Sequence, residues 1–451
     1  MSALEEAVAE SAEPIVLDVW LADHPIPHFL DPVAEAVASF TRTHPGYEIR
    51  LRAVPFRDLP GEVARAVEQG NPPDLAEYYF TATQVALDTR AANGQPLFTP
   101  IQRAIGERTK ILGEPVVVDD LVPAVRAYYS RGDELLSMPT NVSTAILFAN
   151  QDMLTRAGVD RMPRTWRELE AACAAVARLP DGPAHRITWA NHGWMFQMEV
   201  AAQGGLLGDN DNGRSGRATR VTLNSPEMMN YVRWWQRMHA RGHYRHTGEP
   251  RDWLAGMEAF QRQEVAFVVS SSAVGLMIAD MAASAGFSLS TGVLPHNGDV
   301  PYAGQLLGGQ SLFLTAGLPR EKEDGALAFT QHLLNPYHAV KRQYAGSLPL
   351  TVPAQSQLAA EGFFDQHPYF RAGAEQVAAS NLTPAASGAM IGDLNRIHNT
   401  LTAAIHDVLT TRPDPAPRFL AATQEAQALL DHYNAACLAN PPTTPDALEA
   451  G

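Results

Sequence analysis

The sequence predicts an α/β protein with a mainly parallel sheet and more than one lobe, and three observations lead to this prediction. The first part of the chain alternates strand and helix patterns, which is the arrangement that builds parallel sheets. The chain has 451 residues, and single hydrophobic cores stop growing at roughly 250 to 300 residues. Hydrophobic residues make up 45% of the chain and charged residues 18%, as in ordinary soluble globular proteins.

The alternation of strands and helices begins at Ile15. Residues Ile15–Leu21 form a mostly apolar strand, and a helix pattern follows from Asp31. Residues 47–51 alternate in hydrophobicity as a second strand does, and residues 59–69 carry the apolar spacing of a second helix. Residues 73–79 are a third strand. In such sheets ligands bind at the carboxyl ends of the strands, so the loops there are the first candidates for a site.

The stretch from residue 137 to 166 contains the most specific order of residues in the chain. An apolar strand turns at Asn150 into a short helix, which Gly158 ends. Another helix then starts with Thr165 as its N-cap and Glu168 as the capping-box partner. Any α/β protein can contain these element types, so the identity and order of the residues carry the information.

This order resembles the central segment of extracellular solute-binding proteins that serve carbohydrate ABC importers, a family in which the segment leads from one lobe into the other. The resemblance extends from about Ile15 to Asn434, is specific in the central stretch and is loose elsewhere. The residues that carry it are Pro139, Phe148, Asn150, Ala157-Gly158, Pro163 and Thr165-Trp166, with weaker matches at Leu294-Pro295, Gly308-Gly309 and Gly346-Ser347-Leu348-Pro349.

The resemblance implies a two-lobed, periplasmic-binding-protein-like α/β fold with three hinge crossovers and a cleft between the lobes. We expect lobe 1 to comprise residues 14–143 plus 304–346, and lobe 2 to comprise residues 144–303 plus 347–436. Residues 437–451 are expected to form a flexible tail. The backbone segments expected to absorb a rotation of the lobes are those near Val142, residues 304–308 and Gly346.

Charge and missing motifs exclude several classes of function. A net charge of −15 argues against a nucleic-acid binder and against an anionic membrane surface as the main partner. The sequence has no dinucleotide or phosphate-binding glycine loop, no H-E-x-x-H, no G-x-S-x-G and no close Cys/His set. His192, His243 and His246 come nearest to a metal cluster, and solvated histidines are the more common interpretation. We therefore expect neither a cofactor nor a metal ion.

The two cysteines and the N-terminal segment bear on where the protein works. Cys173 falls in a helical pattern and is expected to be a buried thiol, and the sequence leaves open whether it pairs with Cys437. No run is long enough for a membrane span, and the start MSALEEAVAE is acidic where a secretory signal carries positive charge. The resemblance implies an exported, extracytoplasmic protein that is lipid-anchored in its full precursor, with this chain as a trimmed form.

A sugar-binding cleft needs aromatic rings against the apolar faces of the sugar, with amides, hydroxyls and carboxylates for its hydroxyl groups. The loops at the strand ends and at the crossovers supply this mixture. The candidate ligand-binding residues are Asp23, His24, Glu77, Tyr78, Tyr79, Asn141, Ser143, Asn191, His192, Trp194, Ser272, Gly309, Gln310 and Ser347.

The resemblance also implies roles for some of these residues. Tyr78 occupies the position at which the family places a stacking aromatic ring, whereas Trp194 is equally consistent with the core. Asp23 or Glu77 can pair with an ammonium group. The segment PAASGAMIGDL (384–394) lacks the arginine that glycerophosphodiester binders of the family use. A neutral or amine-bearing sugar is therefore expected rather than a phosphate ester.

The function implied is that of the substrate-binding component of an ABC importer. It would bind a mono- or oligosaccharide, an amino sugar among them, and deliver it as a monomer to the permease subunits, without catalysis. Two alternatives remain within reach of the sequence: a glycoside hydrolase, with Asp23, Glu77 and Asp252 as candidate carboxylates, and a glycerophosphodiester-binding transport protein. A receptor that signals occupancy without transport is a third.

Overall fold

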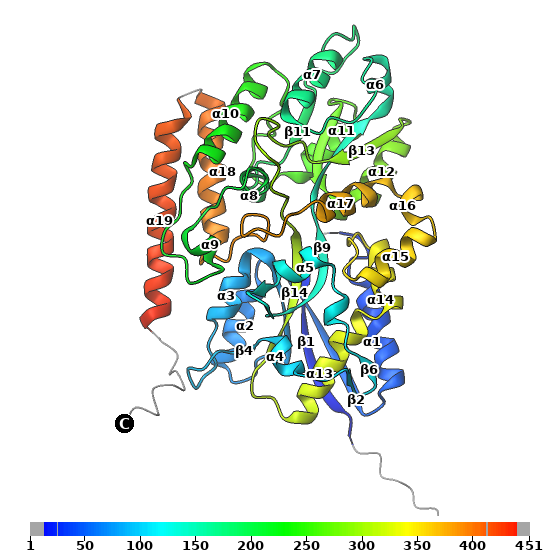
Figure 1. Ribbon diagram of the computed structural model, residues 1–451, viewed down its shortest axis with the longest axis vertical. Helices are drawn as coiled ribbons and strands as arrows, with labels where there is room; N and C mark the ends of the chain where they lie inside the picture. The colour runs from blue at the N-terminus through cyan, green and yellow to red at the C-terminus, as the bar shows by residue number, and fades with distance from the viewer. Residues whose placement is uncertain (1–12, 25, 412–413, 440–451) are drawn as a thin grey trace, which may run out of the picture.

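Two β-sheets organise the protein, and helices cover both of them (Figure 1). The computed structural model describes residues 13–24, 26–411 and 414–439. The first sheet has six strands, namely β1 (Ile15–Asp23), β2 (Tyr47–Pro55), β3 (Leu75–Tyr79), β4 (Phe98–Thr99), β9 (Met138–Ser143) and β14 (Gly308–Thr315). The second has four strands, namely β10 (Ala145–Asn150), β11 (Ile187–Trp189), β12 (Phe267–Ser271) and β13 (Leu289–Val293).

The first sheet begins as the sequence predicts, with β1 parallel to both β2 and β3. Strand β14, which comes from much later in the chain, joins it antiparallel to β3, β4 and β9. Buried Val33, Ala36 and Phe40 belong to α1 (Asp31–Thr43), and buried Leu59 and Val63 belong to α2 (Leu59–Glu68). These apolar positions recur three or four residues apart, as the packing face of a helix requires. The predicted β-α-β-α-β start is confirmed.

The second sheet follows directly from the central stretch of the chain. Strand β10 lies between β12 and β13 and is antiparallel to both, whereas β11 is parallel to β12. The predicted capping box is present at the start of α7 (Trp166–Val176): Glu168 N–H donates to the Thr165 hydroxyl oxygen at 3.2 Å, and the Glu168 carboxylate accepts from Thr165 N–H. Together these bonds satisfy two donors that the helix itself leaves free.

The other helices fall into two groups. Those that precede residue 144 or follow β14 are α3 (Thr83–Asp88), α4 (Ile101–Ile105), α5 (Pro123–Tyr128), α13 (Arg320–Leu333), α14 (Pro336–Tyr344), α15 (Val352–Ala360), α16 (Phe363–Gln366), α17 (Pro368–Ala378), α18 (Leu394–Thr411) and α19 (Pro415–Ala439). Those between β10 and β13 are α6 (Gln151–Arg156), α8 (Gly193–Ala202), α9 (Asp209–Gly213), α10 (Pro226–Ala240), α11 (Trp253–Gln261) and α12 (Gly275–Ser284).

Short elements complete the described chain. They are the strand pairs β5 (Lys110–Ile111) with β6 (Glu114–Pro115) and β7 (Ser130–Arg131) with β8 (Glu134–Leu135), and the 3₁₀ helices η1 (Phe80–Ala82), η2 (Val118–Asp120) and η3 (Ser272–Val274).

The segments that connect the two sheets lie next to one another. Only Thr144 separates β9 of the first sheet from β10 of the second. The Thr144 hydroxyl donates to the backbone oxygen of Leu306, and the backbone N–H of Leu348 donates to Val142 at 2.7 Å. The passage at residues 142–144 is therefore hydrogen-bonded to the segments around Leu306 and Leu348.

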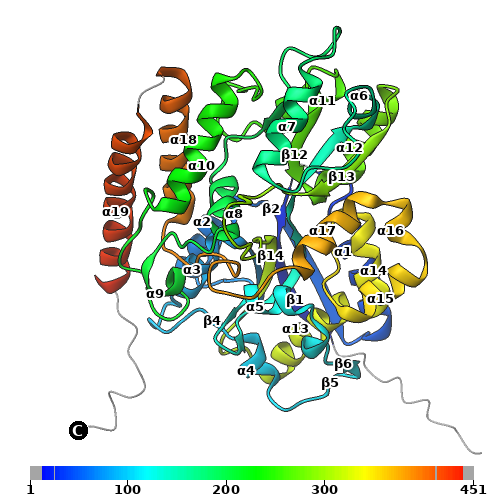
Figure 2. The same ribbon diagram turned by 45° about the horizontal axis from the view of Figure 1, so that its top comes forward.

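The C-terminal helices α18 and α19 pack against each other and against α10, and α18 also packs against α8. Both views show α18 and α19 side by side at one edge of the molecule (Figure 1 and Figure 2).

Cys173 and Cys437 are both free thiols. Of the expected tail, residues 437–439 are the end of α19, and residues 440–451 lie outside the described residues. None of the described helices has the length and apolar character that crossing a membrane requires.

Candidate ligand-binding site

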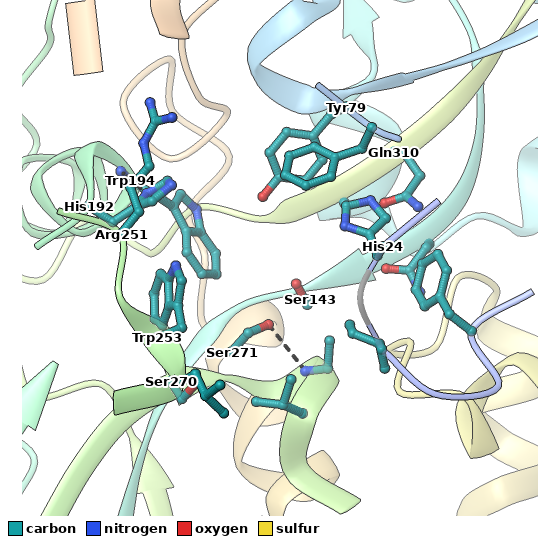
Figure 3. Close-up of a pocket in the computed structure, with 18 of the residues that line it drawn as sticks. His24, Tyr79, Ser143, His192, Trp194, Arg251, Trp253, Ser270, Ser271 and Gln310 are labelled. Atoms are coloured by element: carbon teal, nitrogen blue, oxygen red, sulfur yellow. Dashed lines mark hydrogen bonds between the residues drawn. The ribbon is translucent and has the colours of Figure 1, made fainter. Parts of the chain in front are cut away.

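A cavity of about 470 Å³ lies between the two sheets. The residues that line it from the side of the first sheet are His24, Ile26, Phe29, Phe56, Arg57, Tyr79, Asn141, Ser143, Gly309 and Gln310. Those on the side of the second sheet are His192, Trp194, Arg251, Asp252, Trp253, Leu254, Met257, Ser270, Ser271, Ala273, Val274, Met277 and Asn395. Figure 3 shows His24, Tyr79 and Gln310 facing His192, Trp194 and Trp253 across the cavity.

The first wall is built at the carboxyl ends of three neighbouring strands. His24 follows β1, Phe56 follows β2 and Tyr79 is the last residue of β3. The His24 ring stacks on Phe56, with ring centroids 4.4 Å apart, and Phe56 lies 5.2 Å from the Tyr79 ring. The Arg57 guanidinium lies over the Phe56 ring at 5.1 Å. Aromatic stacking therefore holds a cationic group at the edge of this wall.

The second wall contains two indole rings and a histidine that begins α8. The Trp194 backbone N–H donates to His192 Nδ1 at 3.0 Å, so the proton of the neutral imidazole is on Nε2. The Trp194 and Trp253 rings lie 6.3 Å apart. The buried indole N–H of Trp194 has no hydrogen-bond partner among the described residues, and buried donors are normally paired. It is thus a donor that a ligand oxygen can satisfy.

Two guanidinium groups give the cavity its charge. Neither Arg57 nor Arg251 forms an ion pair within the part of the chain that the structure describes. Arg251 donates to Asn395 O and to the Asn399 side chain, but its Nε–H has no partner there. Burial and the Arg57 charge both lower the pKa of Arg251. Unpaired like charges at one cavity predict a site for an anionic group.

The one carboxylate among the described lining residues is already in use. Asp252 is the N-cap of α11, and its Oδ1 accepts from Ala255 N–H at 2.9 Å. This interaction satisfies one of the free N–H groups at the helix N-terminus. The cavity therefore carries a net positive charge, although the chain as a whole carries −15.

The imidazoles at the cavity are neutral near pH 7. Burial, with a smaller contribution from Arg57, lowers the pKa of His24 to about 4. Burial, followed by the charges of His398, Arg251 and Arg57, holds the pKa of His192 well below its usual range. These rings can donate or accept hydrogen bonds, and the positive charge of the site belongs to the arginines.

His398, which lies behind His192, is expected to make the protein sensitive to acid. Burial lowers the pKa of His398 to about 3, and neither ring nitrogen has a partner among the described residues. A base with a lowered folded-state pKa contributes stability that is complete above about pH 6.5 and is lost as the pH falls toward about 3. His398→Leu should therefore reduce the loss of unfolding free energy between pH 7 and pH 4.5 by on the order of 2 kcal/mol.

Urea unfolding of both proteins at pH 7 and pH 4.5 checks this prediction. The exposed His432 supplies a matched control, since His432→Gln should leave the pH dependence as it is. An unchanged acid sensitivity in His398→Leu would contradict the assignment of the buried neutral imidazole.

The structure brings together eight of the fourteen residues that the sequence nominated. They are His24, Tyr79, Asn141, Ser143, His192, Trp194, Gly309 and Gln310. The other six do not line the cavity, and each has a physical reason to lie elsewhere. They are Asp23, Glu77, Tyr78, Asn191, Ser272 and Ser347.

Tyr78 lies on the wrong face of its strand for the stacking role that the resemblance implied. Successive side chains of a strand point to opposite faces, so Tyr79 faces the cavity and Tyr78 faces the core. The Tyr78 ring is 1% exposed and packs between Phe98 and Phe313, with ring centroids 5.6 and 5.5 Å away. The strand ends where the sequence indicated, and the assignment of its aromatic residue is off by one position.

The opposite orientations of Tyr78 and Tyr79 predict different effects of their substitution on solute binding. Tyr79→Ala should weaken the affinity for the bound solute about tenfold, or 1.4 kcal/mol, because an aromatic wall of the cavity is lost. Tyr78→Phe should leave the dissociation constant unchanged, because that ring packs in the core. Titration calorimetry of the two variants measures both dissociation constants. A larger loss of affinity in Tyr78→Phe than in Tyr79→Ala would refute the placement of Tyr79 at the cavity and Tyr78 in the core.

The two carboxylates that were expected to pair with an amine do not reach the cavity. Glu77 is 2% exposed and accepts hydrogen bonds from Ala22 N–H at 2.8 Å and from the Thr140 hydroxyl. Burial raises the pKa of Glu77, and the nearby Arg342 charge opposes this shift. Asp23, the last residue of β1, is exposed and outside the lining. The geometric basis for preferring an amine-bearing sugar is therefore missing.

The three remaining side chains hold backbone rather than line the cavity. The Ser272 hydroxyl accepts from Thr144 N–H, and the Ser347 hydroxyl accepts from Val142 N–H, each at 3.2 Å. The Asn191 amide donates to Thr402 O at 2.8 Å. Both serines thus fix the region where the chain crosses between the sheets.

Sequence reasoning missed Phe56, Arg57, Arg251 and Trp253. The pattern ended the second strand at Leu51, whereas β2 continues to Pro55. A longer strand would have put Phe56 and Arg57 at its carboxyl end, where the rule for parallel sheets looks for ligands. Arg251 and Trp253 lie around the start of α11, in a segment without a recognisable pattern.

Comparison with known proteins agrees with this architecture. Residues 35–372 match the family described as bacterial extracellular solute-binding protein. The sn-glycerol-3-phosphate-binding periplasmic protein UgpB of Salmonella typhimurium is 25% identical over 411 residues, which cover 88% of this chain and 89% of the relative. UgpB of Escherichia coli K12 is 25% identical over 376 residues, with 82% of each chain covered.

Solved structures have the same fold. The cyclic α-maltosyl-1,6-maltose binding protein of Arthrobacter globiformis has a TM-score of 0.74 at 17% identity, with 93% of this chain and 100% of that chain covered. UgpB of Mycobacterium tuberculosis, solved with glycerophosphocholine, has a TM-score of 0.72 at 20% identity, with 93% and 99% covered. The family match and the shared two-lobed architecture show that this chain belongs to the bacterial extracellular solute-binding proteins, the solute-binding components of ABC importers for sugars and related solutes.

Proposed function

We propose that the solute bound by this protein is a small polyhydroxylated molecule with an anionic group, such as a phosphate ester, which the protein presents to the permease subunits of its importer. The observation that carries this proposal is that Arg57 and Arg251 line one cavity from opposite sheets without an ion-pair partner among the described residues. A guanidinium binds phosphate or carboxylate oxygens with paired, charge-assisted hydrogen bonds. An anion between the two groups would also relieve their mutual repulsion.

The other lining residues suit the hydroxyl-bearing part of such a solute. Asn141, Ser143 and Gln310 offer amide and hydroxyl groups on one wall, and Ser270 and Ser271 offer hydroxyls on the other. The rings of Trp194, Trp253 and Tyr79 can cover the apolar faces of a polyol or sugar. A volume of about 470 Å³ is in the range of small-molecule sites.

The named relatives support the same class. The UgpB proteins are named for sn-glycerol 3-phosphate, and one was solved with glycerophosphocholine. Other structures with this fold are named for cyclic α-maltosyl-1,6-maltose and for maltotriose. The alternative of a glycerophosphodiester-binding transport protein is therefore favoured here over an amino sugar.

The mechanism that we propose is closure of two lobes around the solute. The lobes are residues 14–143 plus 304–346 and residues 144–303 plus 347–436, and in support every strand of the first sheet falls in one and every strand of the second in the other. A solute that touches both walls binds the closed arrangement better than the open one, and this difference in affinity shifts the population.

We further propose that the solute leaves the site unchanged. A glycoside hydrolase needs two carboxylates that face each other across the sugar, whereas Asp23 and Glu77 do not line the cavity and Asp252 caps α11. We also propose that the protein works as an exported monomer and that its full precursor is lipid-anchored. We propose that it does not bind nucleic acid, which its net charge of −15 supports.

Titration calorimetry with sn-glycerol 3-phosphate, glycerophosphocholine, maltose and glucosamine tests the proposed ligand class. The phosphate esters are expected to bind more tightly than either sugar, and their affinity should fall as salt is raised because the attraction is partly screened. Binding of maltose or glucosamine without binding of either phosphate ester would overturn the proposed anionic group and favour a neutral or amine-bearing sugar.

A further inference from the structure

Apolar side chains from both walls line the cavity. On the second wall, Leu254 and Met257 lie three residues apart on α11, while Val274 ends η3 and Met277 lies three residues on, in the first turn of α12. Residues three apart on a helix share a face, and α11 and α12 contact each other. These four side chains therefore line the cavity from neighbouring elements of the second wall.

The first wall adds Ile26 and Phe29 to the apolar lining. Both lie in the turn after β1, where Phe29 N–H donates to Ile26 O at 3.3 Å. Phe29 is 4% exposed and its ring lies 5.1 Å from that of His24, so the turn is packed against the wall. We call the six residues Ile26, Phe29, Leu254, Met257, Val274 and Met277 the apolar end.

The apolar end does not suit a sugar or a bare glycerol phosphate. Hydroxyl groups that turned toward it would lose hydrogen bonds to water and find none in return. Leu254 lines the cavity and is 55% exposed, so the apolar part of a solute can cover it. Methionine side chains are flexible and adapt to apolar groups of varied shape.

We propose that the natural solute is amphiphilic: it carries a short aliphatic chain, which the apolar end buries, on the anionic polyol head that Arg57 and Arg251 bind. The chain could be an acyl or alkyl substituent of a few carbons. This inference rests on the proposed function for the head group. It adds that an aliphatic chain is attached to the anionic head group.

Two probes that share a head group test this inference by calorimetry: sn-glycerol 3-phosphate and its 1-butyryl ester. The ester is expected to bind at least tenfold more tightly, because each buried methylene contributes a factor of about four. Its binding should also show the more negative heat-capacity change, which is the signature of buried apolar surface and requires no variant.

Variants locate the effect. Met277→Gln should remove most of the advantage of the ester, so that the ratio of its affinity to that of sn-glycerol 3-phosphate falls toward one. Met281→Gln, one turn further along α12 and outside the cavity lining, is the matched control and should keep the advantage. Leu254→Ser serves as a second variant, because its exposed side chain can be replaced without risk to folding.

Each outcome separates the two proposals. Equal affinities for the ester and its parent would overturn the amphiphilic solute and leave the anionic head standing. If neither phosphate binds, the same comparison is made with methyl and butyl β-maltoside. A gain for the butyl compound that Met277→Gln removes would support the apolar end as a subsite and overturn the anionic head, whereas no gain would overturn both.

Discussion

Replacing Arg251 with Asn is expected to weaken the binding of an anionic solute by about 100-fold or more. A charge-assisted hydrogen bond to a buried partner contributes about 1.5–3 kcal/mol, and a guanidinium makes two at once. Asn is chosen because Arg251 has a φ of 61°, a left-handed conformation that Asn tolerates better than most residues. Calorimetry against the tightest phosphate ester measures the effect.

A control at the other end of α11 separates this effect from a general change of charge. Arg262, next to the end of α11, is exposed and paired with Glu258 and Glu264, so Arg262→Asn should leave the affinity unchanged. The proposed anion site would be refuted if Arg251→Asn and Arg262→Asn bound the solute equally well. Arg57→Gln is expected to have a smaller effect than Arg251→Asn, since Arg57 is more exposed to water.

Gly346→Ala is expected to lower the stability of the protein by about 3 kcal/mol or more. Gly346 has a φ of 97°, and a Cβ built there would lie 2.3 Å from the backbone oxygen of Ala273. Alanine would therefore suffer both backbone strain and a collision with the second half of the molecule. The free energy of unfolding in urea measures the loss.

Gly362 provides the matched comparison. Its φ of 73° is also left-handed, but a Cβ there would meet nothing within 4 Å. Gly362→Ala should therefore show the backbone term alone, about 1 kcal/mol. Equal losses in the two variants would mean that the close approach of Gly346 to Ala273 is not what requires glycine at the crossover.

The architecture could be predicted because its signals are local. The alternation of residues 15–79 and the capping box at Thr165 and Glu168 depend on neighbours within a few positions, and both are present. The resemblance then supplied the second sheet and the crossovers, which no local signal predicts. The net charge of the chain, in contrast, gave no indication of the positive cavity, because a local field depends on which side chains the fold brings together.

The site was harder to predict than the fold because single positions decide it. A strand pattern indicates that Tyr78 and Tyr79 end β3, but the parity that sends one ring to the core depends on the sheet as a whole. Ser272 and Ser347 have the chemistry of sugar ligands, yet their hydroxyls accept from backbone N–H groups at the crossovers. The backbone N–H of Arg251 donates to Asn191 O, a contact between distant parts of the chain that no sequence pattern predicts.

A crystal structure with the tightest-binding phosphate ester tests most directly the claim that one solute is held by both halves through two arginines. We expect density between the two sheets, with the phosphate within hydrogen-bond distance of both Arg57 and Arg251 and the hydroxyl groups beside Asn141 and Gln310. A solute that contacts only one wall, or whose phosphate lies away from both guanidinium groups, would contradict it.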